Sequence, residues 1–306
     1  MVDSEINDDA PPRIFLWCVP RSCSTALTKM MSFVDGAEIW FEPYVMSWHR
    51  KFNWFELVEK PEVATAMKET LASYANSIPK SKWGNMRPWS SFSYEPNKLI
   101  LERKPQNPET KFIFIKDMAF AIDGQFEYLP ETVPSKHVFL IRHPHRFLPS
   151  YRAAMRKLLT LSPTEEYKHG DSDMVLQGDK GTDQVFSVWK YIRENIDPNP
   201  IVVDTEDILK NPSAILPKLF HNLGITWKDS YLKWKEDKSV MRTWISGLEY
   251  IGSEASNGMF ERALSSGHFI SDDKPLLQKN DMHPDIAKFV DRFMPGYTEM
   301  KKHALT

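Results

Sequence analysis

The sequence lacks several features that would assign it at once to a familiar class of proteins. Its 306 residues include only two cysteines, Cys18 and Cys23, too few for a disulfide-built secreted scaffold. No stretch approaches the ~20 apolar residues that cross a bilayer, and the acidic N-terminus has no secretory signal pattern. Neither sign of charge dominates, because 39 Lys and Arg face 41 Asp and Glu. We therefore expect a cytoplasmic protein with no nucleic-acid or membrane partner.

Motifs of common enzyme classes are also missing. The chain has no G-x-x-x-x-G-K-[ST] sequence, which disfavours ordinary ATP or GTP hydrolysis, and no G-x-S-x-G elbow of a serine hydrolase. The nine histidines are scattered, and His143 and His145 are not at helical ligand spacing. We therefore expect no metal site.

What the sequence does contain is an alternation of apolar runs with helical patterns. The runs show no polar alternation, which is typical of parallel strands buried on both faces. We predict strands at 14–19, 38–41, 112–115, 137–141 and 200–204, with helices at 61–77, 119–129, 144–159, 184–195 and 283–294 and after the first and last strands. The expected fold is α/β, with a central parallel sheet and helices on both faces. Residues 1–12 are predicted to be a disordered tail, and residues 13–306 a single domain with irregular insertions.

The turn at residues 20–25 is the strongest candidate for a binding site. Pro20 ends the first strand, and a helical pattern begins beyond Thr25. Helix N-termini bind anions through their free N–H groups, and Arg21, Ser22, Ser24 and Thr25 would add further donors. The alternative is that Ser24 or Thr25 only caps the helix and Arg21 lies at the surface. Cys23 is either a reactive thiol at a helix N-terminus or, as we favour, a small residue filling the turn.

Other strands of the predicted sheet also end in charged residues. Because ligands bind outside the carboxyl ends of parallel strands, Glu42, Lys116-Asp117, Arg142-His143 and 205–207 should lie near the turn at 20–25. Three of these five strand ends carry a Lys or Arg, which indicates a site for a small polyanion.

These segments resemble the sulfotransferase family. Pro20-Arg21-Ser22-Cys23-Ser24-Thr25 is similar to its 5′-phosphosulfate loop, and Arg142-His143-Pro144 with Ser150 is similar to its 3′-phosphate motif. Further similarities are Thr205-Glu206-Asp207-Ile208 with Pro212, Glu42-Pro43 with Trp48-His49, and Lys116-Asp117-Met118. Together they extend from about residue 13 to residue 212. Two residues depart from the pattern: Cys23 stands where the family has Gly, and Thr205 where it has Tyr.

The resemblance implies a P-loop-like sulfotransferase fold and a co-substrate, 3′-phosphoadenosine 5′-phosphosulfate (PAPS), with 3′-phosphoadenosine 5′-phosphate (PAP) as product and no metal. Arg21, Ser22, Cys23, Ser24 and Thr25 would hold its 5′-phosphosulfate, and Arg142 with Ser150 its 3′-phosphate.

Three residues are expected to be catalytic: Glu42, Arg21 and Lys116. Arg21 would stabilise charge on the leaving oxygen, Lys116 would contact the sulfate or the acceptor, and Glu42 would be the base. The alternative for Glu42 is a structural partner of Arg21 or Lys116, and His49, His143 and His145 are reserve candidates for the base.

The acceptor is expected to be a small molecule with a hydroxyl or amine. Aromatic residues in 44–55 and 83–94 either line its pocket or belong to the core. Residues 246–266, which contain Arg262, are either a further 3′-phosphate segment or a lid. Two other functions stay open, an ATP-dependent P-loop phosphotransferase and a non-catalytic nucleotide-binding protein, and so does homodimer formation.

Overall fold

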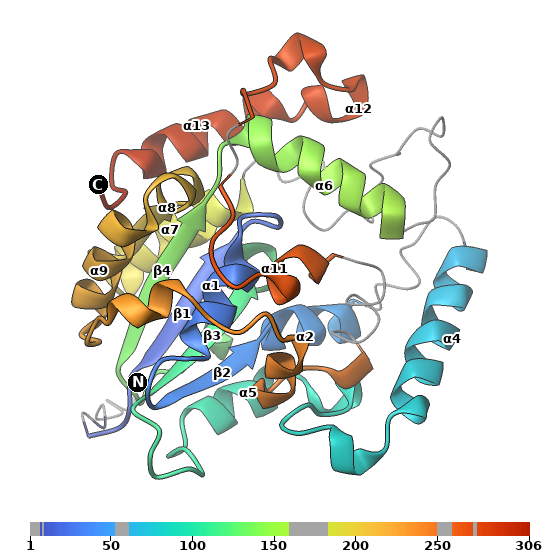
Figure 1. The fold of residues 1–306 in the computed structure, drawn as a ribbon, viewed down its shortest axis with the longest axis vertical. Helices are drawn as coiled ribbons and strands as arrows, with labels where there is room; N and C mark the ends of the chain where they lie inside the picture. The colour runs from blue at the N-terminus through green and yellow to red at the C-terminus, as the bar shows by residue number, and fades with distance from the viewer. Residues whose placement is uncertain (1–6, 8, 53–60, 159–182, 250–258, 272–273) are drawn as a thin grey trace.

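The computed structural model describes residues 7, 9–52, 61–158, 183–249, 259–271 and 274–306. Its centre is a sheet of five parallel strands in the order β2-β3-β1-β4-β5. The strands are β1 (Arg13–Cys18), β2 (Ala37–Phe41), β3 (Phe112–Met118), β4 (Ser135–Ile141) and β5 (Ile201–Asp204). Helices cover both faces of the sheet (Figure 1). The predicted α/β class with a central parallel sheet is confirmed.

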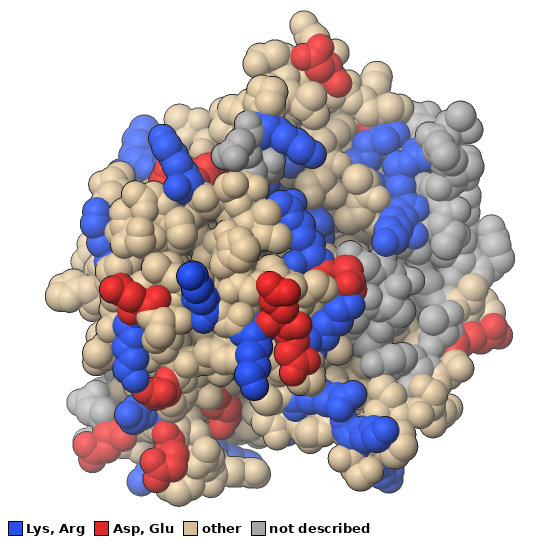
Figure 2. Space-filling view, viewed as in Figure 1, with Lys and Arg blue, Asp and Glu red and all other residues tan. Residues whose placement is uncertain are grey.

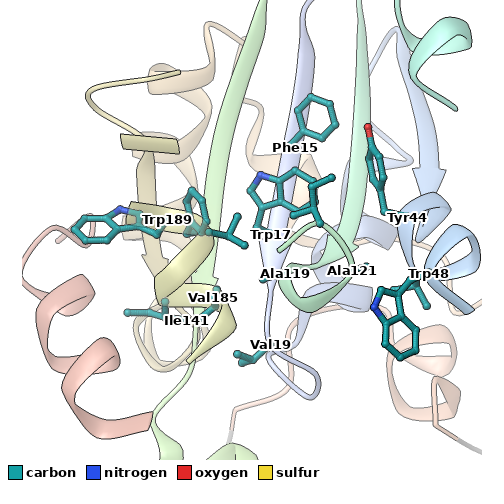
Figure 3. Close-up of a cluster of buried hydrophobic side chains, with 14 of the residues drawn as sticks. Phe15, Trp17, Val19, Tyr44, Trp48, Ala119, Ala121, Ile141, Val185 and Trp189 are labelled. Carbon is teal, nitrogen blue, oxygen red and sulfur yellow. The ribbon is translucent and has the colours of Figure 1, made fainter. Parts of the chain in front are cut away.

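The central strand β1 shows why the apolar runs do not alternate with polar residues. Phe15 and Trp17 belong to one buried cluster, whereas Ile14, Leu16 and Cys18 belong to another on the opposite face. Figure 3 shows part of the first cluster, in which Phe15 and Trp17 lie between Tyr44 on one side and Trp189 on the other. Since both faces of the strand are covered, every side chain of β1 must be compatible with a core.

The helices follow the strands in the order of an α/β fold. They are α1 (Ser24–Met31), α2 (Pro43–Lys51), α4 (Pro61–Ser77), α5 (Tyr94–Leu101), α6 (Pro144–Leu158), α7 (Gln184–Asn195), α8 (Thr205–Lys210), α9 (Pro212–Leu223), α11 (Glu261–Ser265), α12 (Pro284–Ala287) and α13 (Val290–Lys301). Short 3-10 turns occur at Lys80–Lys82, Trp89–Ser91, Ala119–Ala121, Phe126–Tyr128, Asp229–Leu232, Lys238–Thr243 and Lys279–Asp281. No helix among these is long and apolar enough to cross a membrane.

Several predicted elements differ from the structure; the helix expected over 283–294, for example, is two helices, α12 and α13. The helix expected over 119–129 is two separate 3-10 turns, and β3 continues through Met118, so that Lys116 and Asp117 lie within the strand. The sequence pattern did not indicate α2, although Pro43 in its first turn is typical of a helix start. The aromatic residues of α2 obscured its helical period.

Of the predicted tail, residues 7 and 9–12 are described, and residues 1–6 and 8 lie outside the described residues. The Asn7 N–H donates to the carbonyl of Thr132, and Ala10 is buried. This part of the segment therefore contacts the domain.

Candidate functional site

The turn between β1 and α1 has an unusual backbone. Arg21 and Cys23 adopt left-handed conformations, with φ of 64° and 63°, where glycine is the favoured residue. Cys23 is the N-cap of α1, and its side chain makes no capping hydrogen bond. Neither Ser24 nor Thr25 therefore caps this helix, which was one alternative for these hydroxyls. Their side chains are buried beside a cavity instead.

This cavity has a volume of about 660 Å³ and lies where β1, β4, α6 and α11 meet. Six of the seven predicted binding residues line it: Arg21, Cys23, Ser24, Thr25, Arg142 and Ser150. Ser22 does not line it, because its hydroxyl is buried and donates to the carbonyl of Val19 at 2.7 Å. The Ser22 hydroxyl is thus not available to a ligand in the cavity, and only the backbone of this residue could contact one.

The lining of the cavity is rich in cations. Five Lys or Arg residues contribute to it (Arg21, Arg142, Arg146, Arg262 and Lys274), and the lining residues that the structure describes include no Asp or Glu. Two histidines, His145 and His268, are further members. In Figure 2, Lys and Arg side chains stand on both sides of the area between α6 and α11. The arrangement can therefore bind a ligand with several negative charges.

Hydrogen bonds join residues that are far apart in the sequence. Arg21 Nε donates to Ser150 Oγ at 3.2 Å, and Arg142 Nη1 donates to the carbonyl of Arg21. Thr205 Oγ1, fully buried, donates to the carbonyl of Ser22 at 2.8 Å. Thr205 thus holds the turn in place.

The Cys23 thiol lines the cavity but is not activated. Burial raises its pKa to about 11, although Arg142, Arg262 and Arg21 lower it. The thiol is therefore protonated at neutral pH, which favours the interpretation of Cys23 as a small residue that fills the turn.

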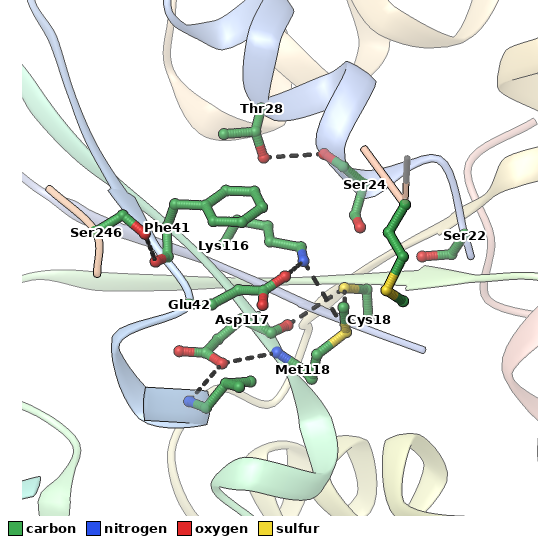
Figure 4. Close-up of polar contacts among 12 residues, drawn as sticks. Cys18, Ser22, Ser24, Thr28, Phe41, Glu42, Lys116, Asp117, Met118 and Ser246 are labelled. Atoms are coloured by element: carbon green, nitrogen blue, oxygen red, sulfur yellow. Dashed lines mark hydrogen bonds and ion pairs between the residues drawn. The ribbon is translucent and has the colours of Figure 1, made fainter. Parts of the chain in front are cut away.

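Glu42 and Lys116 lie in a different environment, and neither lines the cavity. Their side chains form an ion pair with no exposed area, and the Lys116 ammonium lies 4.7 Å from the centre of the Phe41 ring. Burial alone would lower the pKa of Lys116, but the carboxylate of Glu42 outweighs it and raises that pKa. Glu42 is thus a structural partner of Lys116 in this structure, as one of its two predicted roles had it (Figure 4).

The backbone around Glu42 is held on both sides. Its N–H donates to the carbonyl of Lys116 at 2.7 Å, and its φ of 57° is left-handed. Asp117 accepts the N–H groups of Tyr44 at 2.6 Å and Val45 at 3.1 Å, at the start of α2. Residues 116 and 117 of β3 therefore fix Glu42 in a conformation that non-glycine residues rarely adopt.

The three reserve histidines lie in separate places. His145 lines the cavity, and its Nδ1 is 2.6 Å from the carbonyl of Leu277. Burial lowers the pKa of His143, which packs against Tyr297, and lowers the pKa of His49 to about 3. Both rings are thus biased to the neutral form.

The aromatic residues of 44–55 and 83–94 behave mainly as core. Tyr44, Trp48, Phe92 and Tyr94 are buried, and none of them lines the cavity. Residues 53–55 lie outside the described residues. These four side chains therefore belong to the hydrophobic core and do not line the cavity.

Three cavity cations were not predicted as site residues. Arg146 lies in the first turn of α6, four residues after Arg142, and this closeness to the end of β4 could have identified it. Arg262 was noted only as part of a segment that is a 3′-phosphate element or a lid, and its neighbours at 250–258 lie outside the described residues. Lys274 follows an irregular stretch that offered no periodicity.

The fold and the cavity together define an α/β protein with a site for a polyanionic ligand. No family model matches the sequence, and no curated protein matches it either. Among solved structures, it is similar to the sulfotransferase domain from the curacin biosynthetic pathway, with 13% identity, 93% of this chain and 98% of that chain covered, and a TM-score of 0.43.

It is also similar to mouse sulfotransferase SULT7A1 complexed with PAP, with 14% identity, 97% and 90% coverage and a TM-score of 0.44. A third similar structure is retinol dehydratase in complex with androsterone and inactive cofactor PAP, with 16% identity, 95% of this chain and 81% of that chain covered, and a TM-score of 0.46. Two of these three are named as members of the family that the sequence motifs resemble. At such identities the similarity concerns the fold, and the functional argument rests on the site.

Proposed function

We propose that the protein transfers a sulfuryl group from PAPS to a hydroxyl or amine of a small-molecule acceptor. The observation that carries the proposal is the cavity beside the β1–α1 turn, which brings Arg21, Arg142 and Ser150 together. A nucleotide with phosphate on both its 3′ and 5′ positions needs cations at two places, and the chain has no Walker Gly-Lys pair.

The cavity suits such a ligand in size and chemistry. Its volume of about 660 Å³ is within the usual range for small-molecule sites. Leu209, Phe260 and Ile270 supply apolar surface for a flat purine ring. Each charge-assisted hydrogen bond to a phosphate or sulfate oxygen would contribute roughly 1.5–3 kcal/mol.

Catalysis is proposed to rest on positioning and on neutralisation of charge, as in phosphoryl transfer. The acceptor oxygen or nitrogen attacks sulfur while the bond from sulfur to the 5′-phosphate oxygen breaks. Arg21 stabilises the charge that grows on this oxygen, and Lys116 is proposed to lie near the transferring sulfate. Glu42 is the proposed base, which accepts the acceptor's proton; because its carboxylate is buried against Lys116 outside the cavity, this role requires that the acceptor reach the buried pair.

The test is a transfer assay with labelled PAPS and a panel of small alcohols, phenols and amines. Label should appear on at least one acceptor class, and Glu42→Gln should abolish transfer while leaving the affinity for PAP unchanged. Transfer by Glu42→Gln at the wild-type rate would remove Glu42 from the mechanism. Tight PAP binding by the wild type without any transfer would favour the non-catalytic alternative.

A further inference from the structure

A single carboxylate lies behind two arginines of the cavity. Glu206 Oε1 is 3.3 Å from Arg142 Nε, and Glu206 Oε2 is 3.6 Å from Arg146 Nε. Glu206 does not itself line the cavity, and its side chain is 27% exposed. Each oxygen of the carboxylate thus faces the inner nitrogen of one arginine.

With Nε facing Glu206, the terminal nitrogens of both arginines reach the walls of the cavity. Arg142 Nη1 donates to the carbonyl of Arg21 in the turn, and Arg146 Nη2 donates to the carbonyl of Lys274, another residue that lines the cavity. A planar guanidinium has a fixed fork of donors, so holding its Nε also sets the direction of its other N–H groups.

The backbone that carries Glu206 is itself held firmly. Its N–H donates to Asp204 Oδ1 at 2.8 Å, where Asp204 caps α8. Asp204 has no exposed area, accepts the Tyr297 hydroxyl at 2.8 Å and pairs with Lys301 at 2.7 Å. The preceding residue, Thr205, is bonded to the turn at Ser22. Glu206 therefore extends from a backbone segment, the first turn of α8, that hydrogen bonds and an ion pair hold in place.

A carboxylate so close to an anion site has two opposite effects on affinity. It repels a bound phosphate, which weakens binding, and it orients two guanidinium groups, which strengthens binding of a ligand that fits them. The repulsion acts on every anion near the site. The orientation acts only on a ligand whose phosphate reaches both arginines.

We propose that Glu206 is a positioning residue that gives the cavity its preference for nucleotides with a 3′-phosphate over those without one. The inference rests on the proposed function, which assigns the 3′-phosphate to Arg142. Glu206 acts through Arg142 and Arg146 and makes no contact with the ligand.

Calorimetric titrations with PAP and with ADP, at one ionic strength, test this inference on the wild type and Glu206→Gln. Glutamine keeps the length of the side chain and removes its charge. In the variant we expect PAP affinity to fall about tenfold, which corresponds to ~1.4 kcal/mol. ADP affinity should stay the same or rise, so the ratio of the two affinities falls at least tenfold.

Asp207→Asn is the matched control, since it removes a carboxylate from the next residue, one that pairs with Lys301 away from the cavity. It should leave both affinities within twofold of the wild type. A second variant, Glu206→Asp, keeps the charge but is too short to face both arginines, and its affinity ratio should also fall.

The outcomes separate this inference from the proposed function. If the wild type does not bind PAP, the proposed function fails and the inference fails with it. If the wild type prefers PAP but Glu206→Gln keeps the same ratio, or binds PAP more tightly, only the positioning role is overturned. An equal loss in Asp207→Asn would also overturn it, because the effect would then not depend on the arginines.

Discussion

Two groups of charged residues lie at the carboxyl end of the same sheet, and they differ in their access to solvent. Arg21, Arg142 and Arg146 line an open cavity, whereas the Glu42–Lys116 pair has no exposed area. Burying a charge costs folding free energy unless the charge is paired, whereas charges around a cavity keep contact with water and can bind a ligand. We therefore expect the first group to govern binding of the co-substrate, and the second group to govern stability in addition to its proposed part in transfer.

The largest effect is expected from breaking the buried pair. Lys116→Met leaves the Glu42 carboxylate buried without its partner, so the free energy of unfolding should fall by about 3–5 kcal/mol in urea denaturation. The double variant Glu42→Gln/Lys116→Met should recover much of this loss. Lys98→Met, which breaks an ion pair to the exposed Glu131, should cost at most ~1 kcal/mol. Equal losses in the two single variants would show that burial is not what distinguishes them.

The cavity should respond in the opposite way. Arg142→Ala should lower PAP affinity by about 10- to 100-fold, because it removes a charge-assisted contact to the phosphate, and should change the free energy of unfolding little. Calorimetric titration and urea denaturation of the same sample measure both quantities. Lys190→Ala, an exposed substitution on α7, is the control for charge alone. An unchanged PAP affinity in Arg142→Ala would remove this residue from the site.

Acid should destabilise the core, because a buried histidine there is held in its neutral form. Burial lowers the pKa of His137 to about 3, and its Nδ1 accepts the indole N–H of Trp17 at 3.0 Å. Between its unfolded pKa of about 6.5 and its folded value, only the unfolded state binds the proton, so stability is lost as pH falls.

Over this range the contribution of His137 is about 1.4 kcal/mol per pH unit. Urea denaturation at pH 6 and at pH 5 should therefore show a shallower pH dependence for His137→Gln than for the wild type. An identical slope in both proteins would contradict a neutral, buried His137.

The smallest effect concerns the backbone of the turn. Cys23→Gly and Cys23→Ala both remove the thiol, but only glycine removes the cost of the left-handed conformation at φ of 63°. The glycine variant should be more stable than the alanine variant by roughly 1 kcal/mol, measured by thermal unfolding. Equal stabilities would mean that the turn relaxes without strain in both.

Much of the fold could be predicted from the sequence, because buried parallel strands leave a clear signal. The runs at 14–19 and 137–141 lie close to β1 and β4, and parallel strand ends explain why Arg21, Arg142 and Ser150 meet. From the sequence alone, the ion pair between Glu42 and Lys116 was only one of two alternatives, because the sequence does not show which side chains meet between strands or how deeply they are buried.

Other parts of the site depended on irregular segments. The carbonyl of Lys274 accepts a hydrogen bond from Arg146 Nη2, but Lys274 lies in a stretch without helical or strand period, so no pattern could place it. The left-handed Cys23 was noted only as a departure from a motif, whereas its backbone conformation explains why glycine is usual there.

The most direct test of the account is a titration of the wild-type protein with PAP, without metal, and with ADP plus magnesium. Because Arg142 and its neighbours in the cavity are proposed to hold the 3′-phosphate, PAP should bind at least tenfold more tightly. Binding of ADP with magnesium as tight as that of PAP, or tighter, would contradict it and favour an ATP-dependent phosphotransferase.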